Sequence, residues 1–78
     1  MAGTNQEWAD KAARHLKAEL KRAGVTYADL AERLTKNGIP ETDTSVAAKI
    51  NRGVFPAWFL FAVMRAIGAH TLRLEDWA

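Results

Sequence analysis

Apolar residues along most of this chain recur with the three- and four-residue spacing of α-helices. In a first segment, about 6–23, the residues that would stack on one face are Trp8, Ala12, Leu16, Leu20 and Ala23. In a second, about 26–37, they are Tyr27, Leu30, Ala31 and Leu34. Gly24 and Gly38 follow these segments, and glycine favours the left-handed conformation that ends a helix. The pattern predicts two amphipathic helices joined by a tight turn.

Two further helices are predicted in the second half of the chain, at about 44–52 and 56–67. The shorter one has an apolar face of Val46, Ala47 and Ile50. The other is apolar on nearly all sides, and so small a domain cannot enclose it completely. We therefore expect one set of its side chains to face inward, namely Phe59, Leu60, Val63 and Ile67. The others are expected to lie partly outward, namely Trp58, Phe61 and Ala62.

The tail, 70–78, supports two interpretations. Leu72 and Leu74 alternate with polar residues as in a short strand, whereas 74–77 is also typical of the start of a fifth helix. The length of 78 residues fits one domain, 1–78. The predicted fold class is an all-α bundle of four or five helices.

Composition narrows the class of protein. With 49% hydrophobic and 26% charged residues, the chain is an ordinary globular domain, and the absence of cysteine excludes disulfides and thiolate metal sites. The longest apolar run, 54–64, is interrupted by Pro56 and is too short to span a bilayer. The N-terminal residues have neither the basic start nor the apolar stretch of an export signal. We expect a cytoplasmic protein that does not bind membranes.

The order of the predicted helices resembles the helix-turn-helix domains of the lambda-repressor/Cro (XRE-like) type. The resemblance covers about 7–68 and depends on three stretches: Val-Thr-Tyr-Ala-Asp-Leu-Ala-Glu-Arg-Leu at 25–34, Ser-Val-Ala-Ala-Lys-Ile-Asn-Arg-Gly at 45–53, and the apolar 60–68. The motif helices would be about 26–37 and 44–52. The chain also resembles a small, uncharacterised bacterial family of unknown function that shares the Leu-Lys-Ala-Glu-Leu-Lys-Arg stretch at 16–22.

The helix-turn-helix resemblance implies a transcriptional regulator that binds double-stranded DNA, without a cofactor. In that family the second motif helix lies in the major groove. Carried over by position, the residues facing base edges would be Thr44, Ser45, Ala48 and Lys49, and those facing phosphates Thr26, Tyr27, Asn51 and Arg52. We expect Ser45 and Lys49 to project together, unobstructed, from a cationic ridge. A homodimer is expected because it would bind two half-sites.

The chain departs from the helix-turn-helix pattern at the connection 37–43, which is about one helical turn longer than usual. Within it, Glu41 and Asp43 bring negative charge to the end of the helix that would approach DNA. The net charge is +2, and the surplus of Lys and Arg over Asp and Glu lies entirely in 1–39, at seven against five. This excess is modest for a partner of a polyanion.

Each candidate residue also has an interpretation without DNA. Thr26, Thr44 and Ser45 are typical helix caps, Arg52 complements a helix dipole, Lys49 is an ordinary solvated lysine, and Tyr27 suits the edge of a core.

The main functional alternative is a protein-interaction module of the same fold, which would use an apolar surface of Trp58, Phe61 and Trp77 unless the tail covers it. An enzyme is not expected, because His15 and His70 have no ligand spacing and no nucleophile motif is present. We likewise expect no metal.

Overall fold

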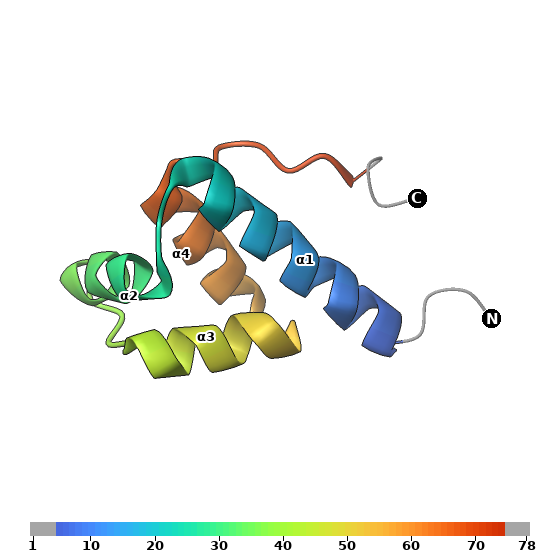
Figure 1. The fold of residues 1–78 in the computed structure, drawn as a ribbon, viewed down its shortest axis with the longest axis horizontal. Coiled ribbons are helices and arrows are strands. Elements are labelled where there is room, and N and C mark those ends of the chain that lie inside the picture. The colour runs from blue at the N-terminus through green and yellow to red at the C-terminus, as the bar shows by residue number, and fades with distance from the viewer. Residues whose placement is uncertain (1–4, 75–78) are drawn as a thin grey trace.

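The computed structural model describes residues 5–74, and within this range the chain forms four α-helices and no strand (Figure 1). They are α1 (Asn5–Ala23), α2 (Tyr27–Lys36), α3 (Asp43–Arg52) and α4 (Ala57–Ile67). α2 packs against both α3 and α4, and α1 crosses the other side of the same two helices. The all-α class is confirmed.

The core lies where the four helices converge. Its fully buried side chains are contributed by every helix: Leu16, Leu30, Leu34, Val46, Ile50, Phe59 and Val63. The prediction for α4 is confirmed for Phe59, Val63 and Ile67, which are buried, whereas Leu60 is only half-buried. Met64 is also buried, although the sequence pattern did not single it out.

The predicted apolar face of α1 is partly wrong. Trp8 is 48% exposed and Ala23 is exposed, while the buried residues are Ala9, Ala13, Leu16 and Leu20. The buried set has steps of four, three and four, which follow the 3.6-residue period more closely than repeated steps of four. Small side chains at the start of α1 also leave room for a neighbouring helix to approach its backbone.

That neighbour is the C-terminal end of α3, which meets α1 at Gly53. Gly53 has φ +67° and donates its N–H to the carbonyls of Ile50 and Lys49, and so caps α3. A Cβ atom at this position would lie 1.9 Å from the carbonyl oxygen of Ala9. Glycine is therefore required twice here, once for the positive φ and once for the close contact between backbones.

The helix boundaries follow the capping residues of the sequence. Thr26 caps α2 as predicted, with its hydroxyl accepting from Asp29 N–H at 3.1 Å. α3 begins at Asp43, one residue earlier than expected, because Thr42 is its N-cap. Pro56 and Gly68 bound α4.

The tail forms neither of its two predicted elements over the residues that the structure describes. Up to Leu74 it contains no strand and no fifth α-helix, and the rest of the predicted tail lies outside the described residues. Between residues 5 and 74, no single helix is long and apolar enough to span a membrane. Only α3 and α4 taken together, bent by 118°, reach that length and hydropathy.

Candidate nucleic-acid interface

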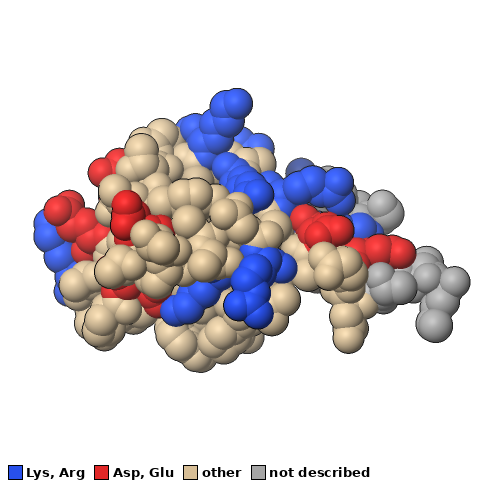
Figure 2. All heavy atoms as spheres, turned by 60° about the horizontal axis from the view of Figure 1, so that its bottom comes forward, with Lys and Arg blue, Asp and Glu red and all other residues tan. Residues whose placement is uncertain are grey.

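The solvent side of α3 carries a continuous row of exposed residues. Opposite the buried Val46 and Ile50 lie four exposed residues, here called the outer row: Thr44, Ala48, Asn51 and Arg52. Ala48 follows Thr44 by four residues, and Asn51 and Arg52 follow Ala48 by three and four, the spacings that place side chains on one side of a helix. Figure 2 shows this side of the molecule, with Lys and Arg at its centre and along its upper edge, and with acidic residues mixed with further Lys and Arg toward its two ends.

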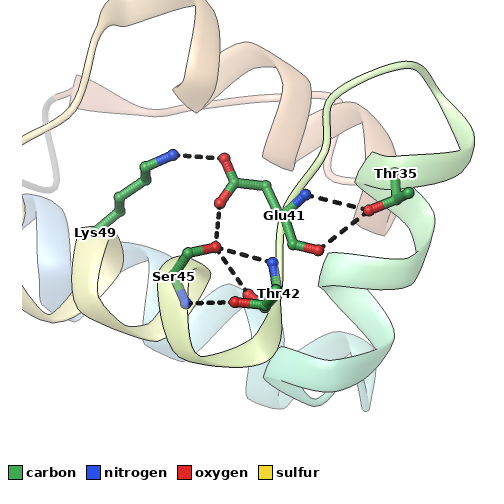
Figure 3. A network of polar contacts seen from close by, with 5 residues as sticks. All are labelled: Thr35, Glu41, Thr42, Ser45 and Lys49. Carbon is green, nitrogen blue, oxygen red and sulfur yellow. Dashed lines mark hydrogen bonds and ion pairs between the residues drawn. The ribbon is translucent and has the colours of Figure 1, made fainter.

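Ser45 and Lys49 lie on the flank of α3, beside the outer row, and both contact Glu41 (Figure 3). Lys49 Nζ is 2.5 Å from Glu41 Oε2, and Ser45 Oγ is 2.6 Å from Glu41 Oε1. One carboxylate therefore uses both of its oxygens on two residues of α3 that are one helical turn apart. The Lys49 ammonium also lies 5.2 Å from the centroid of the buried Phe59 ring.

Glu41 is held in place by its backbone as well as by its side chain. The Thr35 hydroxyl, in the last turns of α2, accepts from Glu41 N–H and donates to the Glu41 carbonyl, both at 3.2 Å (Figure 3). Thr42, the next residue, forms a capping box with Ser45. The connection between α2 and α3 is thus fixed to both helices by polar contacts.

The Glu41 carboxyl is ionised in this setting. Its side chain is only 4% exposed, and this burial alone would raise its pKa. Hydrogen bonds from Lys49 and Ser45, together with the charge of Lys49, outweigh burial and hold the pKa of Glu41 below its ordinary value. Glu41 and Lys49 consequently form a charge pair whose formal charges cancel.

These contacts correct the expectation that Ser45 and Lys49 project unobstructed from a cationic ridge. Both are half-buried, and the polar atoms of both are engaged by Glu41. The sequence had marked Glu41 as a negative charge close to this helix, but not as a partner of these residues. Glu41, Ser45 and Lys49 follow one another at intervals of four residues, so their spacing in the sequence is a signal that could have indicated this contact, although Glu41 lies just before the N-cap Thr42.

The four predicted phosphate contacts fall into two separate groups. Asn51 and Arg52 are exposed in the outer row of α3. Thr26 and Tyr27 begin α2, where the Thr26 hydroxyl is occupied in capping and Tyr27 packs against the core. Beside them is an open hollow of about 320 Å³, which Lys17 and Lys21 also line. Two cationic side chains of α1 and the first residues of α2 therefore line the same hollow.

A second exposed surface lies on and just before α4. Trp58 and Phe61 are 55% and 65% exposed, and Val54 is 61% exposed. Trp58 and Phe61, three residues apart, form an apolar ridge on the outside of α4, and Val54 lies in the segment just before this helix. Trp77, the third residue predicted for this surface, lies outside the described residues.

Comparison with known families identifies the chain as a member of one family. It belongs to the family described as "Domain of unknown function (DUF6471)", whose model matches residues 8–72. The expected resemblance to a small family of unknown function is therefore confirmed, and the helix-turn-helix resemblance stays a prediction. Neither the curated proteins nor the solved structures gave a match.

Proposed function

We propose that this DUF6471 domain binds double-stranded DNA by inserting α3 into the major groove, and that it acts as a transcriptional regulator. The observation that carries the proposal is the outer row, Thr44, Ala48, Asn51 and Arg52, exposed along one side of a helix. The opposite side of that helix is anchored in the core by Val46 and Ile50. A major groove about 12 Å wide accepts one α-helix.

The chemistry of the outer row suits this role. Thr44 carries a hydroxyl that can bond to base edges, the methyl group of Ala48 can contact a thymine methyl, and the Asn51 amide can bond to the phosphate backbone. Arg52 supplies a cation for the phosphate backbone at the end of the helix. Ser45 and Lys49 lie beside this row and are half-buried, so they would be at the edge of the proposed interface and not at its centre.

The test is a salt titration of duplex binding, followed by fluorescence anisotropy. Affinity should fall linearly with log salt, and Arg52→Ala should make the slope shallower by about one, because one phosphate contact is lost. Arg65→Ala is the matched control. It removes the same charge from the last turn of α4, on the opposite side of the molecule from α3 (Figure 1), and should leave the slope unchanged. Absence of duplex binding above background at low salt would refute the proposal.

A protein partner is the second candidate, favoured by the exposure of Trp58 and Phe61. Aromatic side chains are enriched at the centres of protein interfaces. For a DNA-binding domain, the partner expected on this ridge is a second copy, which would add a second α3. Sedimentation velocity should then show a dimer that Trp58→Ala and Phe61→Ala weaken, while Trp8→Ala on α1 leaves it intact. A monomer in all variants would reject self-association.

A further inference from the structure

Glu41 bonds to Ser45 and Lys49, the two residues that lie beside the outer row at the edge of the proposed interface. These bonds affect which DNA sequences the domain can bind. We propose that Glu41 is a specificity-determining residue: it competes with DNA phosphates for Lys49 and Ser45 and so weakens binding that is independent of sequence. The inference rests on the proposed function. It assigns Glu41 a role opposite to that of a simple repulsive charge.

The opposite charges of Lys49 and Glu41 cancel one another at a distance. The Lys49 ammonium lies 2.5 Å from a Glu41 oxygen, and the side chain that carries this carboxylate is almost fully buried. Seen from a phosphate several ångströms away, the two charges form a dipole with no net charge. Because non-specific DNA affinity comes from cations that neutralise phosphates, Lys49 contributes little to it while Glu41 is ionised.

Lys49 nevertheless stays accessible to a ligand. The Lys49 side chain is 40% exposed, so the ammonium remains in reach of solvent although its partner is not. An ammonium has three N–H donors, and Glu41 and the face of Phe59 do not consume all of them. Lys49 can therefore still donate to an acceptor brought within hydrogen-bond distance, such as the O6 and N7 atoms of guanine. The ion pair with Glu41 thus weakens the long-range attraction of Lys49 to phosphates, but leaves Lys49 able to donate a short-range hydrogen bond to a base.

The hydrogen bonds of Ser45 limit what it can offer to DNA. Its single hydroxyl proton has two acceptors, the nearer Glu41 carboxylate at 2.6 Å and the Thr42 carbonyl at 3.1 Å, and its oxygen accepts from Thr42 N–H at 2.9 Å. A hydroxyl has one donor and two acceptor lone pairs, so only one lone pair remains. In the groove Ser45 would act as an acceptor, for the amino group of adenine or cytosine, and not as a donor to phosphate.

The test compares Glu41→Gln with Asp43→Asn, measured on a random-sequence duplex across a salt series. Both variants remove one negative charge near the start of α3, but only Glu41 contacts Lys49; Asp43 instead accepts from Thr44 N–H at 2.8 Å. Glu41→Gln should steepen the salt slope by about one and raise affinity roughly three- to tenfold at low salt, because Lys49 is released. Asp43→Asn should not steepen the slope.

A double variant identifies Lys49 as the source of the gain. Glu41→Gln combined with Lys49→Met should lose the extra slope that Glu41→Gln alone acquires, and circular dichroism should show each variant folded at the assay temperature. Equal gains for Glu41→Gln and Asp43→Asn, or a gain that survives Lys49→Met, would overturn the competition while leaving DNA binding intact. If neither the unaltered protein nor Glu41→Gln binds a duplex at low salt, the proposed function itself is wrong.

Discussion

The two ends of α3 are fixed by different kinds of interaction. At the C-terminal end, Gly53 contacts the backbone of Ala9 so closely that no side chain could be placed between them. At the N-terminal end, a polar network from Thr35 through Glu41 to Ser45 and Lys49 connects α3 to the preceding loop and to α2. The first contact depends on steric exclusion and the second on charge and hydrogen bonding.

Because of this difference, the C-terminal end of α3 does not tolerate a side chain at Gly53, whereas the polar contacts at its N-terminal end can rearrange. The backbones of Gly53 and Ala9 are in direct contact, and close packing leaves no space into which either could move. A partly exposed ion pair can exchange one partner for another group or for water. The N-terminal half of the helix, which the proposed function places against base edges, is therefore the end whose chemistry can respond to a ligand.

The largest effect is expected from Gly53→Ala. The new Cβ would overlap the Ala9 carbonyl oxygen at 1.9 Å, and the residue would also be held at φ +67°. We expect the free energy of unfolding to fall by about 3 kcal/mol or more, from overpacking and left-handed strain together. Urea denaturation followed by circular dichroism measures it.

Gly68→Ala isolates the backbone strain from the clash. Gly68 has a similar φ of +76°, but a Cβ added there would meet no atom within 4 Å, so only left-handed strain remains, about 1 kcal/mol. Similar losses for the two variants would show that the α1–α3 contact relaxes easily, and the contrast between the two ends of α3 would fail.

A smaller loss is expected from Glu41→Ala at the other end of the helix. The change removes a buried carboxylate and leaves Ser45 and Lys49 without this acceptor, which should lower the free energy of unfolding by about 1–2 kcal/mol. The cost stays moderate because Lys49 can turn to solvent. Thermal and urea unfolding measure it.

Glu32→Ala is the control for this loss. Glu32 pairs with Lys36 at 3.9 Å on the surface of α2, with both side chains more than 70% exposed. Exposed pairs contribute little, so the change should be within about 0.5 kcal/mol of zero. A loss equal to that of Glu41→Ala would mean that burial of Glu41 adds nothing to the network.

The helices could be predicted from the sequence because their causes are local. The apolar spacing of α2, the cap at Thr26 and the stop at Gly68 depend on residues a few positions apart, and the structure has them where expected. The error in α1 came from Ala9, whose burial depends on Gly53 of a distant segment. The pairing of Glu41 with Lys49 was missed for another reason: Glu41 precedes the N-cap Thr42 and so lies outside the helix, although its distances of four and eight residues from Ser45 and Lys49 are helical.

The smallest effect is the dependence of the polar network on pH. The folded protein holds the pKa of Glu41 below its ordinary value, so it binds this proton less readily than the unfolded chain does. The stabilisation is therefore complete above the ordinary value of 4.5 and is lost as the pH falls through the lower, folded value. Glu41→Gln carries no titrating group at this position, so the other carboxyls, common to both proteins, cancel in the comparison. Urea midpoints at a series of pH values should show the stability advantage of the unaltered protein over Glu41→Gln shrinking below pH 4.5, whereas an advantage that stays constant would place the stabilisation in packing rather than in charge.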